Sequence, residues 1–192
     1  LGFDDVGAFR AILRDASEAK GRPREPTPEE IQALVEAKKP RYLERARRQL
    51  STFPGAAAVI GERAAVGPVG IVSGALRGEI ELGLEVLGVR HLVSFVVSAE
   101  DTAACKPDPE GYLAGIAQLT ERIGPVAARQ ALVFEDSLAG IQSASRAGLH
   151  CVAVAHSYPR EQLLEAGARW AVSRLEELGG EVLRGYWREL TA

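Results

Sequence analysis

Residues 131–148, ALVFEDSLAGIQSASRAG, constrain the fold more than any other segment of the chain. The segment opens with four apolar residues, a pattern typical of a short buried strand. Glu135 and Asp136 end that run, and Ser137 can then cap a helix whose apolar residues recur at helical spacing before a closing glycine. The pattern predicts a buried strand that leads through two acids directly into a helix.

Two adjacent carboxylates at the exposed tip of a buried strand raise the question of what stabilises them. Their charges cost free energy at such a place unless a cation meets them. A Mg²⁺ ion is a common partner, because one or two carboxylates and the oxygens of a bound phosphate can hold it. The alternative is that Glu135 is a surface acid and that Asp136 only caps the helix. This segment alone leaves both interpretations open.

Strands and helices alternate from residue 53 onward. Strands are predicted at residues 69–72, 92–97, 132–134 and 151–155, with a further short apolar piece at 170–172. Helices are predicted at residues 76–87, 109–123, 138–147 and 160–166, followed by a helical C-terminal tail. Such alternation indicates an α/β fold, a parallel sheet with helices on both faces, in which ligands bind beyond the carboxyl ends of the strands.

Residues 1–51 are predicted to form a small helical module, since they contain no convincing strand. Apolar residues recur at helical spacing over residues 6–13, and a Gly-Arg-Pro break follows at residues 21–23. A second helix is expected after Thr27, which can act as its N-cap and is followed by a proline and two acids. A third helix is expected after Pro40.

The composition is that of an ordinary soluble globular protein, with 46% apolar and 26% charged residues. A net charge of −3 gives no reason to expect binding to nucleic acid or to a membrane, and no segment resembles a membrane span or a signal peptide. Cys105 and Cys151 form no metal-ligand pattern, which favours reduced thiols and a cytoplasmic location. The chain lacks methionine and begins at Leu1, so we expect part of the translated protein to lie upstream.

The first predicted strand is followed by Ser73, Gly74 and Ala75. A hydroxyl next to the first turn of a helix offers a side-chain donor and main-chain N–H groups to an anion. The alternative is simpler: Ser73 caps the next helix and Gly74 provides the turn. Taken alone, this segment favours the simpler interpretation.

The second predicted strand is followed at a short distance by Lys106 in the segment KPDP. The two prolines restrict the backbone, so Lys106 lies on a rigid lead-in to the next helix. A lysine held in this way can act as a point charge for a phosphoryl oxygen, although a solvated surface lysine is the alternative. The hydroxyl, the lysine and the acid pair fall at equivalent ends of the predicted strands, and their joint occurrence indicates one site.

Together these motifs resemble the haloacid dehalogenase (HAD) superfamily. Ser73 in GIVSGA is similar to its second motif, Lys106 in CKPDPEGY to its third, and Glu135 with Asp136 in VFEDSLAGIQSASRAG to its fourth. The resemblance covers residues 53–175 and implies a Rossmann-like parallel sheet flanked by helices. It also implies that residues 1–51 are a partial α-helical cap of the phosphoglycolate phosphatase and β-phosphoglucomutase group. Residues 52–192 would then be the core without its first strand.

The resemblance implies a phosphate-binding role for the first two motifs. Ser73 would donate to the transferring phosphoryl group, with the main chain of Gly74 and Ala75 beside it. Lys106 would bind the same phosphoryl group and stabilise its charge during transfer, without a role in folding. Arg77, one helical step beyond Ser73, would meet the substrate.

The fourth motif and the cap would complete the site. Glu135 and Asp136 would hold Mg²⁺, Asp136 directly or through water. Lys38, followed by Tyr42, is similar to a cap lysine that faces the active site in this group. An ordinary solvent-facing helix position for Lys38 is equally compatible with the sequence.

The first motif of the superfamily, DxDGT, is absent from this chain. It supplies an aspartate nucleophile and a second aspartate that acts as general acid and base. Asp4 and Asp5 are no substitute, because no strand precedes them and the order of cap and core would be wrong. We therefore expect the first core strand, its motif and the first part of the cap to lie upstream of Leu1.

The resulting hypothesis is a Mg²⁺-dependent phosphatase that hydrolyses a small phosphorylated metabolite, similar to phosphoglycolate or a sugar phosphate, through an aspartyl-phosphate. A β-phosphoglucomutase-like sugar phosphomutase is the alternative, and a non-catalytic protein that binds phosphate or a metabolite is a third hypothesis. Dehalogenation is disfavoured, because dehalogenases of this superfamily lack the acid pair. The sequence identifies neither the substrate nor the oligomeric state.

Overall fold

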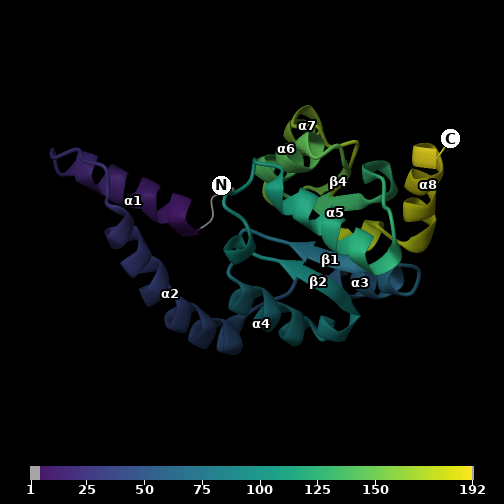
Figure 1. Cartoon of the computed structure of the whole chain (residues 1–192), viewed down its shortest axis with the longest axis horizontal. Helices are drawn as coiled ribbons and strands as arrows, with labels where there is room; N and C mark the ends of the chain where they lie inside the picture. Colours follow the sequence, from purple (N-terminus) through teal and green to yellow (C-terminus); the bar gives the residue numbers. More distant parts are fainter. Residues whose placement is uncertain (1–4, 192) are drawn as a thin grey trace.

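The computed structural model describes residues 5–191. Two helices, α1 (Asp5–Ala19) and α2 (Pro28–Gln49), form an arm that projects from the rest of the molecule (Figure 1). The remaining elements form a body of strands covered by helices, and α2 packs against helix α4 (Arg77–Leu87) of this body. The two helices predicted first along the chain are therefore present, while their assignment to a separate cap domain stays a prediction.

Helix α2 begins as the sequence predicts and continues further than predicted. The hydroxyl of Thr27 accepts a hydrogen bond from the Glu30 N–H at 3.3 Å, and the Glu30 carboxylate accepts one from the Thr27 N–H at 2.9 Å. The predicted start of a new helix after Pro40 is wrong, because α2 runs through Pro40 without a break. Proline removes one main-chain donor. Pro40 and Glu36, whose carbonyl loses that donor, are both exposed, so water can replace the bond.

The body alternates strands and helices as predicted. Its strands are β1 (Val69–Val72), β2 (Val93–Val97), β3 (Leu132–Glu135), β4 (His150–Val154) and β5 (Trp170–Val172). Its other helices are α3 (Ala56–Ala64), α5 (Glu110–Ile123), α6 (Leu138–Arg146), α7 (Arg160–Glu165) and α8 (Gly180–Thr191). The ends of the predicted strands and of the four predicted helices agree with these bounds to within one residue. Helix α3 was not predicted, because AAAVIGERA has little apolar periodicity.

The strand pairs of the described residues are all parallel, as predicted, but they form two sheets rather than one. Strand β1 pairs with β2, while β3, β4 and β5 form a second sheet in that order. The side chain of Lys106 contacts the last residues of both β1 and β3, which places the carboxyl ends of the two sheets side by side. This division is consistent with the predicted absence of a core strand, which stays a prediction.

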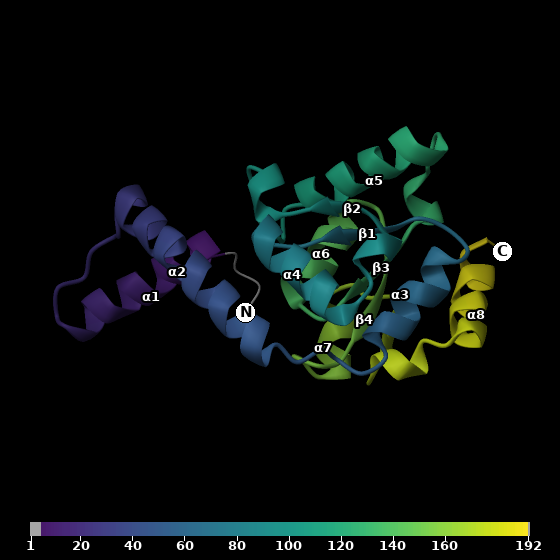
Figure 2. The same cartoon turned by 90° about the horizontal axis from the view of Figure 1, so that it is seen from below.

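Successive residues of a strand point to opposite faces of the sheet, and both faces are covered. On one face Val133 and Cys151 pack with Ile141 of α6. On the other face Val152 packs with Leu183 of α8. Figure 2 shows the strands enclosed between helices, with α5 and α8 on opposite sides. The body therefore has the three-layer α/β architecture that the alternation predicts.

Two further observations concern the predicted environment of the protein. Both cysteines are unbridged, Cys105 being exposed and Cys151 buried. Burial raises the pKa of the Cys151 thiol to about 12, and the charge of Glu135 adds to the shift. Among residues 5–191, no helix combines the length and the apolar character that crossing a membrane requires.

Candidate active site

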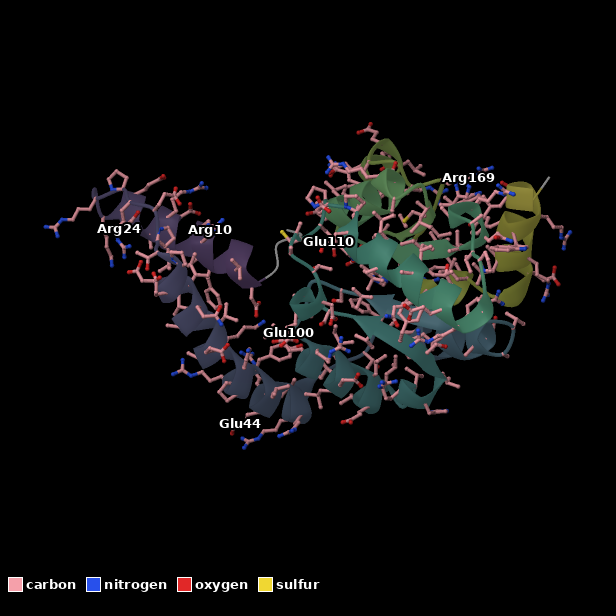
Figure 3. All side chains as sticks on the ribbon, viewed as in Figure 1. Arg10, Arg24, Glu44, Glu100, Glu110 and Arg169 are labelled. Atoms are coloured by element: carbon pink, nitrogen blue, oxygen red, sulfur yellow. The ribbon has the colours of Figure 1, made fainter. Side chains whose placement is uncertain are left out.

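A cavity of about 620 Å³ lies where the α1–α2 arm meets the carboxyl ends of the strands. Its lining includes Ser73, Gly74, Ala75, Lys106, Glu135 and Asp136 from the body, and Asp5, Lys38 and Tyr42 from the arm. All of the predicted site residues except Arg77 therefore lie around one cavity, at the edge of the sheet where α/β proteins bind ligands. Figure 3 shows Glu100 and Glu110 at the edge of the body that faces the arm.

Ser73 is the first residue after β1. Its N–H donates to the carbonyl oxygen of Val97 at 2.9 Å, which adds one bond to the β1–β2 pairing. Its hydroxyl oxygen accepts a hydrogen bond from the Ala75 N–H at 3.1 Å. Because a hydroxyl both accepts and donates, its proton can still be donated to a ligand oxygen in the cavity. The predicted capping of the next helix by Ser73 is wrong, because Leu76 is the N-cap of α4 and the Ser73 hydroxyl accepts its bond before the helix begins. The turn still offers a donor to an anion.

Lys106 reaches from the loop before α5 to the junction of the two sheets. Its Nζ lies 3.2 Å from the carbonyl oxygen of Val72 and 3.3 Å from the hydroxyl of Tyr112, and it pairs with the carboxylate of Glu135. The side chain of Lys106 is 18% exposed and that of Glu135 is 8% exposed. Removing one member of a buried ion pair leaves an uncompensated charge. Contrary to the prediction from the sequence, these contacts lead us to expect that Lys106 also contributes to folding.

Glu135 is held at the N-terminus of α6. Its Oε2 accepts hydrogen bonds from the main-chain N–H of Asp136 at 3.0 Å and of Ser137 at 3.2 Å, and from the Ser137 hydroxyl at 3.0 Å. The N-terminus of a helix stabilises negative charge. Gly140 leaves the space that the carboxylate needs, because a Cβ at this position would lie 2.0 Å from the Glu135 carboxyl carbon. Any larger residue at position 140 is incompatible with this placement of Glu135.

This environment shifts two pKa values in opposite directions. Burial on its own raises the pKa of Glu135, but the charge of Lys106 and several hydrogen bonds outweigh it, so the pKa lies below its ordinary value. Burial raises the pKa of Tyr112 well above its ordinary value, and the charge of Glu135 raises it further. The Tyr112 hydroxyl donates to Glu135 Oε1 at 2.9 Å. At neutral pH an ionised glutamate therefore lies between an ammonium group and a neutral phenol.

Asp136 is half-buried, and its Oδ2 accepts a hydrogen bond at 2.9 Å from the hydroxyl of Ser157, in the loop after β4. The described part of the chain contains no group of three or more His, Cys, Asp or Glu side chains suited to a metal ion. The donor set does fit Mg²⁺ bound by one carboxylate, water and a substrate phosphate, because Mg²⁺ commonly takes few protein ligands. Asp136 would supply that carboxylate, whereas both oxygens of Glu135 accept hydrogen bonds from protein groups. The binding of Mg²⁺ by Glu135 and Asp136 stays a prediction.

On the arm side of the cavity, Lys38 of α2 lies in the wall and forms ion pairs with Asp5 and Glu79. Its Nζ lies 2.6 and 2.7 Å from the two carboxylate oxygens of Asp5 and 2.9 Å from Oε1 of Glu79 in α4. It also lies 5.1 Å from the centre of the Tyr42 ring. Burial lowers the pKa of Lys38, but the hydrogen bonds with Asp5 and Glu79 outweigh that effect, so the pKa is raised.

Arg77 is not among the residues that line this cavity. Its guanidinium group lies 2.5 Å from the carboxylate of Asp101 and 3.3 Å from the carbonyl oxygen of Val96. Hydrogen bonds from Ser98, together with that from Arg77, lower the pKa of Asp101 to about 2, so this pair is charged at neutral pH. The predicted contact of Arg77 with substrate finds no support in this geometry, because Asp101 binds its guanidinium group elsewhere.

Sequence reasoning missed five residues of the site: Asp5, Glu79, Tyr112, Gly140 and Ser157. Asp5 was considered only as a substitute for the first motif. Tyr112 and Gly140 lie inside the segments CKPDPEGY and VFEDSLAG, so their position next to a motif was a usable signal. Glu79 and Ser157 gave none. The contact of Glu79 arises from packing of α2 on α4, and that of Ser157 from the loop after β4.

Residues 11–154 match the family model described as haloacid dehalogenase-like hydrolase, which is more than half of the chain. The chain belongs to this family. The HAD membership predicted from Ser73, Lys106 and the acid pair is thereby confirmed, as is the similarity to the phosphoglycolate phosphatase and β-phosphoglucomutase group.

Two curated relatives of this HAD-like chain are phosphatases by name. The chain is 39% identical over 99 residues to validoxylamine A 7'-phosphate phosphatase from Streptomyces hygroscopicus subsp. limoneus, over 52% of this chain and 44% of that protein. It is 33% identical over 130 residues to phosphoglycolate phosphatase from Rhodospirillum rubrum, over 67% of this chain and 52% of that protein. The chain thus spans about half the length of the curated relatives it matches.

Solved structures of HAD-like proteins resemble the whole chain. A β-phosphoglucomutase from Clostridium difficile superimposes with a TM-score of 0.78 at 21% identity, covering 98% of this chain and 78% of that chain. CbbY from Rhodobacter sphaeroides, in complex with phosphate, gives a TM-score of 0.75 at 24% identity, covering 92% of this chain and 75% of that chain. At these identities the likeness establishes the fold, and the predicted Rossmann-like α/β class is confirmed.

Proposed function

We propose that this chain provides the phosphate- and Mg²⁺-binding part of a phosphatase that hydrolyses a small phosphorylated metabolite. The observation that carries the proposal is the position of Lys106, held between the Val72 carbonyl and Glu135 in a cavity that Ser73 also lines. A preorganised cation and a hydroxyl donor in one cavity form a combination suited to binding a phosphoryl group and stabilising the charge of its transfer.

In this proposal each of these side chains contributes to binding the phosphate or the metal. Lys106 attracts the phosphoryl oxygens, and Glu135 positions it so that little reorganisation is needed during the reaction. Ser73 donates its hydroxyl proton to the same group, within the turn formed with Gly74 and Ala75. Asp136 would hold Mg²⁺, which when bound neutralises charge on the phosphate.

The proposed reaction passes through an aspartyl-phosphate. Each carboxylate of the described cavity already has a task or a partner: two pair with Lys38, one pairs with Lys106, and Asp136 is assigned to the metal. That the nucleophile is an aspartate of a first motif absent from these 192 residues stays a prediction from the sequence. A cytoplasmic location, the cap at residues 1–51 and the core at residues 52–192 likewise stay predictions.

The curated relatives support hydrolysis over phosphoryl transfer to a sugar. Two of them are named as phosphatases of phosphorylated small molecules. The phosphomutase alternative is supported by structural likenesses at 21% and 22% identity, which concern the fold. We therefore prefer a phosphatase, with the phosphomutase as the second candidate.

Calorimetric titration with inorganic phosphate, with and without Mg²⁺, tests the proposal. We expect Mg²⁺ to strengthen phosphate binding, and we expect Lys106→Met and Ser73→Ala each to weaken it. Lys39→Ala is the matched control, because Lys39 is an arm lysine that pairs with Glu36 and does not line the cavity. Phosphate binding that survives both substitutions unchanged would contradict the proposal.

Turnover requires a second experiment. A longer form of the chain that includes any DxDGT motif encoded upstream should hydrolyse p-nitrophenyl phosphate in the presence of Mg²⁺, and residues 1–192 alone should not. Turnover by residues 1–192 would show that the nucleophile lies within this sequence and that its proposed location is wrong.

A further inference from the structure

On the arm side of the cavity, the described residues carry more negative than positive charge. Among the cavity-lining residues that the structure describes, Lys38 is the cation on this side, and both Asp5 and Glu79 lie within ion-pair distance of its ammonium group. The three side chains are largely shielded from solvent, with exposed fractions of 28% for Lys38, 22% for Asp5 and 7% for Glu79. Two carboxylates thus share one ammonium group in a partly buried place, where water screens charge weakly.

Glu79 cannot easily turn away from this position. Its Oε2 accepts a hydrogen bond from the Leu76 N–H at 3.3 Å, at the N-terminus of α4, where a negative charge is favourable. Lys38 comes from α2, so the same contact joins the arm to the body. Glu79 is therefore a fixed part of the cavity wall, and Lys38 holds Asp5 beside it.

If the phosphoryl group binds at Ser73 and Lys106, the cavity wall formed by Asp5, Lys38 and Glu79 faces the rest of the substrate. A second anionic group extending toward the arm then meets the carboxylates of Asp5 and Glu79 and a lysine that is already paired with them. Like charges held close together are costly. Hydroxyl groups, in contrast, can donate to carboxylate oxygens that still have lone pairs, and the apolar face of a sugar ring can pack on Tyr42.

We propose that the Asp5–Lys38–Glu79 cluster is a specificity determinant that selects neutral, polyhydroxylated phosphate monoesters and rejects substrates with a second anionic group. The cavity, at about 620 Å³, has the size of a small-molecule site. This inference rests on the proposed function, because it requires the phosphoryl group to bind at Lys106.

Calorimetry of the 192-residue chain in Mg²⁺ with three probes tests the inference. The probes are inorganic phosphate, glucose 6-phosphate, whose remaining groups are neutral hydroxyls, and 2-phosphoglycolate, which adds a carboxylate. We expect glucose 6-phosphate to bind at least about tenfold more tightly than 2-phosphoglycolate, a modest effect for a like-charge contact.

Variants of the Asp5–Lys38–Glu79 cluster then test whether it causes the difference in affinity between glucose 6-phosphate and 2-phosphoglycolate. The double variant Asp5→Asn with Glu79→Gln keeps the shape of the wall and leaves Lys38 with a net charge. This double variant should bind 2-phosphoglycolate about tenfold more tightly, while its affinity for inorganic phosphate should change little. Asp5→Asn alone should act in the same direction, more weakly, and covers the case in which the double variant does not fold. Glu36→Gln is the control, because Glu36 is an exposed acid of α2 that pairs with Lys39 outside the cavity.

The outcomes separate the inference from the proposed function. Equal affinity for glucose 6-phosphate and 2-phosphoglycolate, with inorganic phosphate binding that depends on Lys106, would overturn the inference alone. If the cluster has only a structural role, the double variant should bind all three probes more weakly, and this result would also overturn the inference. Binding of inorganic phosphate that does not depend on Lys106 would instead overturn the proposed function.

Discussion

Lys106 donates a hydrogen bond of 3.2 Å to the main-chain carbonyl oxygen of Val72, the last residue of β1. The same ammonium group pairs with Glu135 at the end of β3, in the other sheet. One side chain thus connects two sheets that are not hydrogen-bonded to each other within the described residues. The residue proposed to bind phosphate is consequently also a structural residue, and its two roles can be separated by experiment.

Lys106→Ala should lower the free energy of unfolding as well as phosphate affinity. The substitution leaves Glu135 buried without its counter-charge, which commonly costs about 3–5 kcal/mol. We expect the lower end of that range, because Tyr112 and two main-chain N–H groups still donate to the carboxylate. Urea denaturation of both proteins measures the difference.

A double variant separates the two roles of Lys106. Lys106→Met together with Glu135→Gln removes both charges, so much of the lost stability should return, since a neutral buried pair avoids the uncompensated charge. Phosphate affinity should not return, because the cation is still missing. Recovery of phosphate binding in the double variant would show that Lys106 supports the site only through the fold.

Gly140→Ala should disturb the site from a position that contacts no substrate in our proposal. The new Cβ would lie 2.0 Å from the carboxyl carbon of Glu135, so that side chain must move away from Lys106. We expect a loss of about 1–3 kcal/mol, as for other overpacked sites, with weaker phosphate binding. Gly83→Ala is the matched control: a Cβ there meets nothing within 4 Å, and alanine in α4 should be neutral or stabilising. Equal effects of the two substitutions would contradict the steric argument.

Asp136→Asn should remove the effect of Mg²⁺ and leave the metal-free protein almost unchanged. In the parent chain, Mg²⁺ with phosphate should raise the melting temperature, because a ligand that binds only the folded state stabilises it. The asparagine oxygen can still accept the hydrogen bond from Ser157, so stability without Mg²⁺ should change by less than about 0.5 kcal/mol. Asp15→Asn, at an exposed acid of α1, serves as control. A full Mg²⁺-dependent shift in Asp136→Asn would exclude Asp136 as the metal ligand.

Much of the fold was predictable because its signals are local. The strand and helix around Glu135 follow from a four-residue apolar run, an N-cap serine and a helical repeat, all within eighteen residues of sequence. The continuation of α2 through Pro40 was not predictable in this way, because whether a proline ends a helix depends on whether water can reach the carbonyl that loses its donor. The division into two sheets likewise could not be predicted from short sequence segments, because the pairing of strands depends on residues far apart in the sequence.

The site was predictable where it depends on sequence motifs and unpredictable where it depends on packing. Ser73, Lys106 and Asp136 follow strand ends, and parallel strands bring such residues to one edge. The partner that Lys38 finds in Glu79 could not be inferred, because Glu79 reaches it only after α2 has packed on α4. Tyr112 could have been placed near Lys106 only through its position in the same motif. Arg77 shows the reverse case: its spacing from Ser73 suggested the cavity, but Asp101 from the loop after β2 binds it elsewhere.

The last prediction concerns Tyr112 at alkaline pH. Burial and the neighbouring Glu135 charge raise its pKa well above its ordinary value of 10.0, so the folded protein keeps the phenol proton at a pH where the unfolded chain loses it. The associated stability is fully present below about pH 10 and is lost as the pH rises from there toward the folded-state pKa. Tyr112→Phe removes this titration, so its free energy of unfolding should fall less steeply above pH 10.

Ultraviolet titration of tyrosinate and denaturation at several pH values measure both quantities. Glu135→Gln supplies an independent check, because removing the neighbouring charge should lower the pKa of Tyr112 while the phenol stays buried. An identical pH dependence of stability in the parent chain and in Tyr112→Phe would show that the phenol does not titrate against this carboxylate, and the arrangement of Glu135 between Lys106 and Tyr112 would have to be revised.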